Sequence, residues 1–234
     1  MFVAEFLNIV IIAGRVYGKS GGGISMKMKD YILAIKEYFM DEYGEAECSL
    51  DFESPLELLI ATQLATQCTD ARVNIVMKDL VKKYKTCEDY ANADLEELMQ
   101  DVKPTGFYRN KAKNIIGTCK ILLEKYNGEV PSSMEQLTEL PGVGRKIANL
   151  IRGDVFGIPG IVVDTHCMRL SRRMGLTKET EQHKIEKDLV KKIPKDYQTL
   201  FCHQMVEHGR KYCQARKPHC DECILNDICR KKLK

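Results

Sequence analysis

The stretch Leu140-Pro141-Gly142-Val143-Gly144-Arg145-Lys146 (LPGVGRK) predicts a tight turn between two helices. Pro141 ends the first helix, and Gly142 and Gly144 permit a left-handed backbone and close approach by a partner. The next helix begins with N–H groups at 143–146 that have no partner within it, and its dipole favours an anion there. Such a hairpin can grip a nucleic-acid backbone, although a plain helical corner fits the turn equally well.

Lys146 favours the functional interpretation. It lies in the first turn of the second helix, at the edge of an apolar stripe made by Val143, Ile147, Leu150 and Ile151. The helix dipole and partial burial are both expected to lower the pKa of a lysine placed there. A neutral amine is what covalent attack on a sugar carbon requires, so Lys146 is a candidate nucleophile. The alternative is an exposed lysine that contacts phosphate.

Elsewhere the sequence predicts helices and almost no strands. Ser54-Pro55-Leu56-Glu57 resembles a capping box, Thr69-Asp70 can cap another helix, and Asn127-Gly128 is a typical left-handed stop. Ser132-Ser133 can start the helix that leads into the hairpin. We therefore predict an all-α fold of about ten short helices. The remaining helices fit near 28–43, 86–100, 111–126, 144–156, 165–174, 179–192 and 196–210, and only 158–163 looks extended.

A carboxylate follows the extended segment. Asp164, in Val162-Val163-Asp164-Thr165-His166, can cap the helix that opens there, which is the usual role of Asp at such a position. A carboxylate at the end of an apolar run can also face a cleft, where it acts as a base or stabilises a cationic transition state. His166 fits a structural or phosphate-contacting role better than a catalytic one.

Ten cysteines form two groups. Four of them crowd into the C-terminal end with the spacing C-x6-C-x2-C-x5-C: Cys213, Cys220, Cys223 and Cys229. In a reducing compartment such a cluster predicts metal binding rather than disulfides, and the spacing alone leaves zinc and an iron–sulfur cluster open. The others stand alone and are expected to be small buried hydrophobic residues: Cys48, Cys68, Cys87, Cys119, Cys167 and Cys202.

Composition places few further limits on function. The chain of 234 residues has 36 basic and 33 acidic side chains, so a nucleic-acid surface must come from local clustering of charge. Residues 1–26 are expected to be a disordered extension or an incorrectly assigned start, with 19–25 (KSGGGIS) as a flexible linker. The apolar stretch 2–13 is too short to span a bilayer and lacks the features of a signal peptide. We therefore expect a cytoplasmic protein, associated with the nucleoid in a prokaryote.

Three motifs in this order resemble the endonuclease III family of DNA glycosylases: LPGVGRKIA (140–148), VDTH (163–166) and the C-terminal cysteine spacing. The segments LATQCTD (64–70) and TGFYRNKA (105–112) also resemble segments of that family. The resemblance covers about residues 27–234. Each motif is moderately specific by itself, and the ordered set is highly specific.

The resemblance implies a helix–hairpin–helix DNA glycosylase fold in two helical lobes. Residues 48–158 would form the central lobe, with the helix–hairpin–helix at about 133–156. Residues 27–47 and 159–234 would form the other lobe, which ends in a [4Fe–4S] cluster loop at 213–229. DNA would lie in the cleft between the lobes. The four clustered cysteines would hold the iron.

The resemblance also implies a bifunctional DNA glycosylase and AP lyase of base excision repair, acting as a monomer on double-stranded DNA with damaged pyrimidines or abasic sites. Lys146 matches the family's nucleophile, which forms a Schiff base, and Asp164 its essential carboxylate. β-Elimination would then break the strand 3′ to the lesion. Gln67 matches the residue that fills the gap left by the flipped base, and Phe107 the wedge in the opposite strand. The hairpin residues Gly142, Val143, Gly144 and Arg145, and also His166, would contact DNA.

Three alternatives remain at this level. A monofunctional glycosylase for mismatched adenine is disfavoured because that branch lacks the lysine that Lys146 provides. A non-enzymatic DNA-binding or redox-sensing iron–sulfur protein would make both Lys146 and Asp164 coincidental. A zinc-binding RNA module fits the cysteines but not the hairpin.

Overall fold

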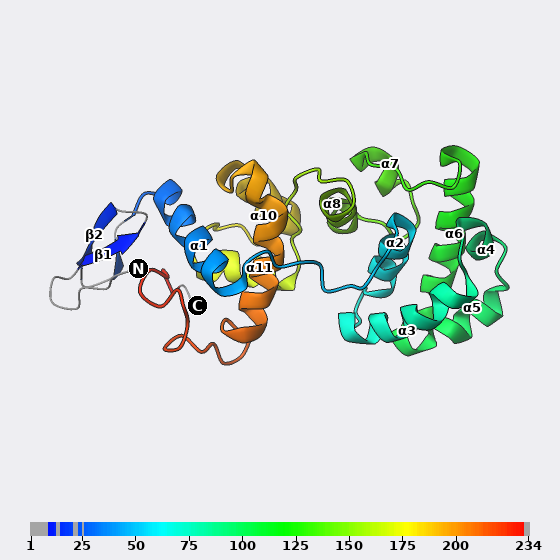
Figure 1. Ribbon diagram of the computed structural model, residues 1–234, viewed down its shortest axis with the longest axis horizontal. Coiled ribbons are helices and arrows are strands. Elements are labelled where there is room, and N and C mark those ends of the chain that lie inside the picture. The colour runs from blue at the N-terminus through cyan, green and yellow to red at the C-terminus, as the bar shows by residue number, and fades with distance from the viewer. Residues whose placement is uncertain (1–8, 13–14, 21–22, 25, 232–234) are drawn as a thin grey trace. The chain divides into compact units, whose positions relative to one another are not determined.

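The computed structural model describes residues 9–12, 15–20, 23–24 and 26–231 (Figure 1). The chain divides into two compact units, Cys48–Gly160 and Met1–Glu47 with Ile161–Lys234. Within residues 26–231 the backbone forms eleven α-helices, two 3₁₀ helices and no strand, so the all-α prediction is confirmed for this part. No helix among the described residues is long and apolar enough to cross a membrane.

The unit Cys48–Gly160 is built around a buried helix, α2 (Pro55–Leu64). All side chains of α2 from Leu58 to Leu64 are buried, because neighbours cover the helix on several sides. It packs against α3 (Asp70–Lys83), α6 (Tyr108–Tyr126) and α8 (Arg145–Asp154). The other helices of this unit are α4 (Cys87–Ala91), α5 (Leu95–Val102), η1 (Lys103–Thr105) and α7 (Met134–Thr138).

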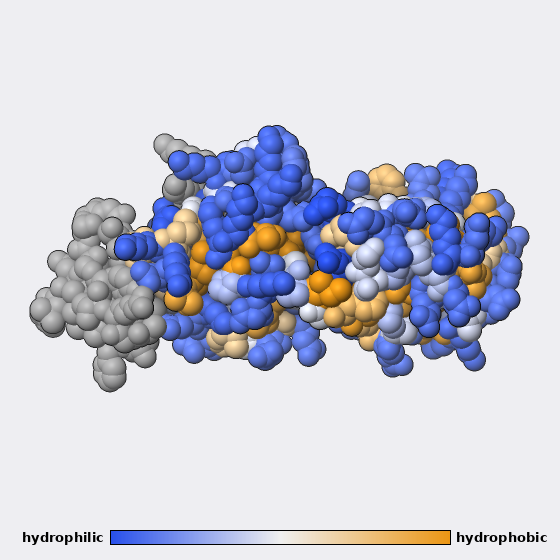
Figure 2. Space-filling view, turned by 90° about the horizontal axis from the view of Figure 1, so that it is seen from above, coloured by the Kyte–Doolittle hydropathy of each residue, from blue (hydrophilic) through white to orange (hydrophobic). Residues whose placement is uncertain are grey.

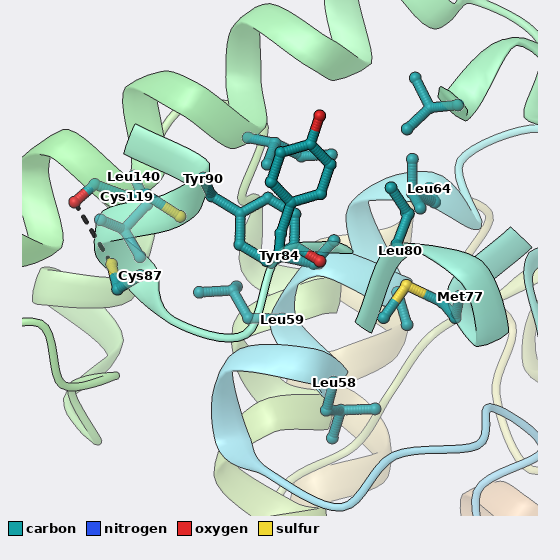
Figure 3. Packing of buried hydrophobic residues seen from close by; sticks show 14 of the residues in the cluster. Leu58, Leu59, Leu64, Met77, Leu80, Tyr84, Cys87, Tyr90, Cys119 and Leu140 are labelled. Atoms are coloured by element: carbon teal, nitrogen blue, oxygen red, sulfur yellow. Dashed lines mark hydrogen bonds between the residues drawn. The ribbon is translucent and has the colours of Figure 1, made fainter. Parts of the chain in front are cut away.

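The hydrophobic core of this unit brings together side chains from all its longer helices (Figure 3). Leu58 and Leu59 from α2 and Leu80 from α3 are almost fully buried. Burying a leucine side chain stabilises a fold by about 1.5–3 kcal/mol relative to leaving it exposed. Cys119 on α6 is also buried, and the Cys87 thiol donates to its carbonyl oxygen at 3.4 Å. These two cysteines pack as small hydrophobic residues, as predicted.

Several helix ends lie where the local sequence predicts them. The Ser54 hydroxyl accepts a hydrogen bond from the Glu57 N–H at 3.2 Å and starts α2. Thr69 caps α3 in the same way. α6 ends at Asn127, which has a φ of 54° and is followed by Gly128 with a φ of 79°. Such caps depend on neighbours in the chain, so the sequence alone reveals them.

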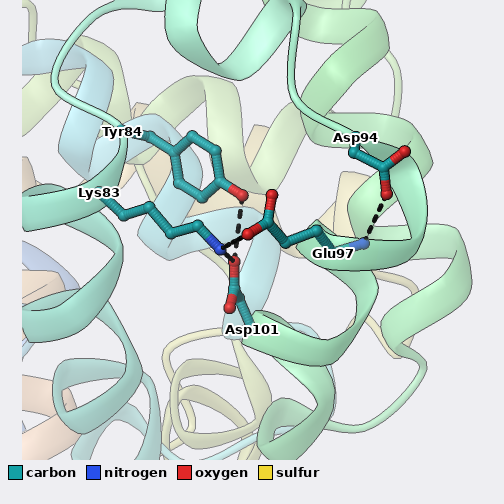
Figure 4. A network of polar contacts seen from close by, with 5 residues as sticks. All are labelled: Lys83, Tyr84, Asp94, Glu97 and Asp101. Atoms are coloured by element: carbon teal, nitrogen blue, oxygen red, sulfur yellow. Dashed lines mark hydrogen bonds and ion pairs between the residues drawn. The ribbon is translucent and has the colours of Figure 1, made fainter.

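The predicted continuous helix at 86–100 is wrong, because the structure has α4 and α5 there. Asp94 interrupts the helix, since its carboxylate accepts a hydrogen bond from the Glu97 N–H at 2.9 Å and begins α5. A polar network then ties α5 to α3 (Figure 4): Lys83 pairs with Glu97 at 2.8 Å and with Asp101 at 2.6 Å. The Tyr84 hydroxyl donates to the same Asp101 carboxylate at 3.0 Å.

The second unit pairs α1 (Met28–Tyr43) with α11 (Gln198–Lys211). The rings of Phe39 and Phe201 stack with centroids 6.4 Å apart, and the Gln204 amide donates to the Gly44 carbonyl at 2.7 Å. The unit also contains α9 (Thr165–Arg173), α10 (Gln182–Lys192) and η2 (Lys195–Tyr197). The segment 158–163 forms no strand, and the Val162 N–H bonds to the Cys202 sulfur at 3.2 Å.

The described part of the N-terminal extension differs from the prediction of disorder. β1 (Ile9–Ile12), β2 (Arg15–Ser20) and β3 (Gly23–Ile24) form a small antiparallel sheet in the order β1-β2-β3. Ile9 pairs with Gly18, and Lys19 in the supposed linker pairs with Ile24. The run IVII at 9–12 is β-branched throughout, which favours strands over helices. Residues 1–8 of the predicted extension lie outside the described residues.

Candidate functional site

The hairpin between α7 and α8 is a four-residue turn. The Val143 N–H donates to the Leu140 carbonyl at 3.0 Å, and Gly142 has a φ of 75°. Proline in the second position and glycine with positive φ in the third are the requirements of a type II turn, and Pro141 and Gly142 meet them. A Cβ atom on Gly142 would lie 2.5 Å from the Asn114 side-chain nitrogen on α6. Only glycine fits this position.

Two buried polar side chains hold the hairpin against the core. The Gln63 amide donates to the Pro141 carbonyl and to the Thr118 hydroxyl, at 2.8 Å each. The Thr118 hydroxyl donates in turn to the Pro141 carbonyl at 3.2 Å. Because Gln63 lies on α2 and Thr118 on α6, the turn is anchored to two helices of the core. Neither residue is among those predicted from the sequence, although a glutamine within the apolar run LELLIATQLA is a signal.

The helix after the turn opens without a side-chain cap. Gly144 occupies the N-cap position. The first hydrogen bond of the helix runs from the Ala148 N–H to the Gly144 carbonyl at 2.9 Å. The N–H groups of the first turn therefore point out of the helix end, where the dipole attracts an anion. Two details correct the prediction. The Val143 N–H is used within the turn, and Gly144 has an ordinary φ of −96°.

Lys146 lies in the first turn of α8 as predicted, but its side chain is exposed rather than partly buried. Val143 and Ile151 are buried, while Ile147 and Leu150 are half-buried, so the apolar stripe faces the core. Lys146 lies outside that stripe. The amine is thus accessible to a large substrate that approaches the hairpin, and so is the guanidinium-bearing side chain of Arg145.

Gln67 and Phe107 share an unusual backbone. Both are exposed and have positive φ, 53° for Gln67 and 48° for Phe107, which costs a non-glycine residue about 1–2 kcal/mol. Phe107 is 62% exposed, so it is not a core aromatic residue. Figure 2 shows that hydrophilic side chains cover most of the visible face of the described residues. An aromatic ring held in water by a strained backbone is typical of a functional site.

Asp164 and His166 belong to the second unit. The Asp164 carboxylate accepts a hydrogen bond from the Cys167 N–H at 2.7 Å, so the predicted cap of α9 is present. The side chain of Asp164 is only half-buried, so its second carboxylate oxygen is accessible to a substrate. The ring of His166 bonds to the Arg169 guanidinium at 3.1 Å, which fits a structural role.

The four C-terminal cysteines line one cavity, together with His208 and Tyr212. Among the described residues, no group of three or more His, Cys, Asp or Glu side chains is close enough to hold a single metal ion. Four thiols around one cavity fit the ligand set of an iron–sulfur cluster. Burial raises the pKa of the Cys223 thiol to about 11, because an apolar cavity disfavours a bare thiolate. The positive charge of iron bound there would offset that cost.

Two arginines that are not among the residues predicted from the sequence contact this loop. The Arg173 guanidinium donates to the Cys213 sulfur at 3.5 Å and to the Gln214 carbonyl at 2.7 Å. Arg169 donates to the Cys213 carbonyl at 3.1 Å. The two arginines are four residues apart on α9, so they share a helix face, and that spacing was the available signal. They connect the helix that begins at Asp164 to the first cysteine of the loop.

A histidine closes the other side of the cavity. Burial lowers the pKa of His208 to about 4, so its ring is neutral near pH 7. Its Nε2 lies 3.5 Å from the Cys223 sulfur, and its Nδ1 lies 2.9 Å from the Tyr43 hydroxyl. Arg173 and His208 can therefore donate hydrogen bonds to the sulfurs of Cys213 and Cys223, an arrangement suited to a stable cluster.

Comparison with known families agrees with this site. Residues 60–195 match the HhH-GPD superfamily of base excision DNA repair proteins. Residues 213–229, which begin and end at cysteines, match the iron–sulfur binding domain of endonuclease III. The protein therefore carries a [4Fe–4S] cluster, as the resemblance implied, and the four clustered cysteines remain its predicted ligands.

Comparison with whole proteins also identifies relatives named endonuclease III. The chain is 45% identical to endonuclease III of Bacillus subtilis (strain 168) over 203 residues, covering 85% of this chain and 93% of that protein. It is 42% identical to endonuclease III of Escherichia coli (strain K12) over 185 residues, covering 79% and 88%. Two solved structures, a trapped endonuclease III–DNA covalent intermediate and a non-covalent endonuclease III–DNA complex, each align with a TM-score of 0.83, 43% identity and 88% and 97% coverage. The chain therefore belongs to the endonuclease III family, within the HhH-GPD superfamily of base excision DNA repair proteins.

Proposed function

We propose that this protein is a bifunctional DNA glycosylase and AP lyase that removes damaged pyrimidines from duplex DNA through a covalent bond to Lys146. The observation that carries the proposal is the exposed lysine in the uncapped first turn of α8, directly behind a hairpin fixed to the core. A lysine at this place can reach a nucleotide whose phosphates bind the helix end. Membership of the endonuclease III family supports the same chemistry.

The hairpin binds DNA through its backbone. Gly144 has nothing within 4 Å of the position that a Cβ would occupy, so a phosphate can approach the helix N-terminus closely. Binding of this kind carries no sequence information, which suits an enzyme that must search all sequences for rare lesions. The covalent and non-covalent DNA complexes of the related endonuclease III structures support this role.

Lys146 supplies both activities. The neutral amine of Lys146 attacks the sugar C1′. The bond from C1′ to the base breaks, and the electron pair of that bond leaves with the base, which takes up a proton. Ring opening gives a Schiff base between Nζ and C1′. The iminium acidifies the C2′ hydrogen, and loss of that proton expels the 3′ phosphate. Lys146 is exposed in the unit Cys48–Gly160, so its amine is accessible to the sugar of a bound nucleotide.

Asp164 is proposed to stabilise positive charge that develops on the sugar, or to accept a proton during the attack. One of its oxygens is occupied by the Cys167 N–H, which fixes the direction of the carboxylate. The charge of the group, rather than its capping bond, is what the chemistry needs.

A damaged base must leave the helix before any of these steps, and lesions that weaken stacking reduce the energy required. Gln67 is proposed to enter the gap, and Phe107 to wedge into the opposite strand. Phe107 is well suited to this, since its exposed apolar ring gains by leaving water for the base stack.

The [4Fe–4S] cluster shapes the loop 213–229 when bound. Arg216 and Lys217 lie in this loop and are exposed, and Arg210 and Lys211 precede it at the end of α11. A basic loop fixed by a cluster can contact DNA phosphates. We further propose that the protein acts as a monomer in the cytoplasm, at the nucleoid of a prokaryotic cell.

The function is tested with the cluster-loaded protein and end-labelled duplexes that carry dihydrouracil, thymine glycol or an abasic site. We expect release of the free base and a strand break 3′ to the lesion, with undamaged duplex left intact. Duplexes with adenine opposite guanine test the adenine-mismatch alternative and should remain uncut. If none of the oxidised pyrimidines is released by protein that still cleaves abasic sites, the proposed substrate class is wrong.

A further inference from the structure

Lys111 is a buried lysine that the proposed chemistry does not use. It lies in the first turn of α6 and is only 4% exposed. Its ammonium donates to two backbone carbonyls, those of Leu64 at 2.8 Å and Thr105 at 2.7 Å. Lysine is almost never fully buried unless it is paired, and a cation near a helix N-terminus opposes the dipole. Burial accordingly lowers the pKa of Lys111.

The two carbonyls end two different elements. Leu64 is the last residue of α2, and Thr105 is the last residue of η1. Carbonyls at helix ends lack partners within the helix and attract a cation. One ammonium therefore satisfies the ends of two elements that are 41 positions apart in the sequence (105 minus 64). The Lys111 ammonium thus joins the loop 65–69 to the segment 103–107, which consists of η1 and the two residues after it.

Each of these loops carries an exposed residue with positive φ. Gln67 follows Leu64 by three positions, and Phe107 follows Thr105 by two. A strained backbone persists only where its surroundings determine it. The hydrogen bonds of α6 help to hold the backbone of Phe107, because its carbonyl accepts a hydrogen bond from the Lys111 N–H at 3.1 Å. Lys111 thus contacts the Phe107 loop through both its backbone and its side chain.

We propose that Lys111 is a positioning residue, whose ammonium sets the relative placement of Gln67 and Phe107 for entry into the two strands of damaged DNA. The entry into DNA rests on the proposed function, whereas the coupling of the two loops rests on geometry alone. Hydrogen bonds from a charged donor are stronger than those between neutral groups, so two of them can hold both loops in place. Small displacements of such groups reduce rates by up to about 100-fold.

The test compares Lys111→Met with Ile115→Ala in the full-length, cluster-loaded protein. Methionine keeps the length of the side chain but removes its charge. Ile115 lies one turn further along α6 and is fully buried, so its truncation destabilises the same helix without touching either carbonyl. Thermal unfolding of both variants is measured, so that lost activity can be compared with lost stability.

Hydrogen exchange without DNA tests the coupling itself. In Lys111→Met, amide exchange should rise together in 65–69 and 103–107, and in Ile115→Ala it should not. Unchanged exchange in either loop of Lys111→Met overturns the coupling. This result does not depend on whether the protein excises any base, so it separates failure of the inference from failure of the proposed function.

Activity tests the consequence for DNA. Lys111→Met should excise dihydrouracil from duplex DNA about 10- to 100-fold more slowly in single turnovers. It should cleave an abasic site in single-stranded DNA within about twofold of the wild-type rate, because there is no opposite strand to wedge and no gap to fill. A 2-aminopurine placed opposite the lesion should change its fluorescence when wild-type protein binds, and this change should be lost with Lys111→Met. If duplex and single-strand rates fall in parallel in both variants, Lys111 has only a structural role.

Discussion

The amide nitrogen of Gln63 lies 2.8 Å from the carbonyl oxygen of Pro141, and this contact fixes the hairpin to the central helix of its unit. The next residue of α2, Leu64, offers its carbonyl to Lys111. Two consecutive residues at the end of one buried helix therefore hold the hairpin and the two exposed loops. The part of the protein proposed to grip DNA and the part proposed to enter it share one support.

Replacing Gln63 by Leu should loosen the hairpin. The Pro141 carbonyl would keep only the weaker contact with Thr118, so we expect a loss of about 1–2 kcal/mol in the free energy of unfolding and weaker DNA binding. The control is Thr62→Val, which removes a buried hydroxyl bonded to Leu59 on the same helix. DNA affinity is measured by fluorescence anisotropy. Equal affinities in the two variants would contradict the role of Gln63.

The two hairpin glycines should respond differently to alanine. Gly142→Ala places a Cβ 2.5 Å from Asn114 at a φ of 75°, so it should lower the unfolding temperature. Gly144→Ala meets no atom within 4 Å, so stability should be unchanged while DNA binding weakens. Thermal denaturation and DNA titration of both variants check this. Wild-type affinity in Gly144→Ala would contradict the close approach of a phosphate.

Asp164 combines a cap and a charge, and two variants separate them. Asparagine can still accept the hydrogen bond from Cys167, so Asp164→Asn should keep its stability and lose base excision by at least about 100-fold. Asp164→Ala loses the cap as well and should be about 1 kcal/mol less stable. Single-turnover excision and chemical denaturation are the measurements. An active Asp164→Asn enzyme would limit this residue to the cap.

The cluster assignment predicts a yellow-brown protein that contains iron and acid-labile sulfide. Cys220→Ala should lose most of both, while Cys48→Ala, which changes a scattered cysteine of the other unit, should keep them. Loss of the cluster should weaken DNA binding, because the basic loop 213–229 is no longer fixed. Full iron content in Cys220→Ala would remove Cys220 from the ligand set.

Much of this site could be predicted because its sequence signals are local. The turn at 140–143, the caps at Ser54 and Asp164 and the cysteine spacing each depend on residues close together in the chain. What could not be predicted depends on distant contacts. Gln63 reaches a carbonyl 78 positions away, Lys111 one that is 47 positions away, and neither partner is visible from spacing.

Burial of single side chains was the weakest part of the prediction. Lys146 was expected at a buried edge because its helix has an apolar stripe, and the structure places it in water. A helical stripe gives the direction of the core but not how far the neighbouring helices extend over its edges. The strands at 9–24 show the same limit, since a short apolar run fits a strand or a buried helix equally well.

Borohydride trapping tests whether Lys146 forms a covalent bond with the sugar. Cluster-loaded protein is mixed with a duplex that carries dihydrouracil or an abasic site, and the reductant is added during turnover. We predict a protein–DNA adduct on gel electrophoresis that is absent in Lys146→Ala and retained in Lys120→Ala, which changes an exposed lysine of α6. Mass spectrometry should place the sugar on Lys146. Excision of the base by wild-type protein with no trapped adduct, or an undiminished adduct in Lys146→Ala, would show that Lys146 is not the nucleophile.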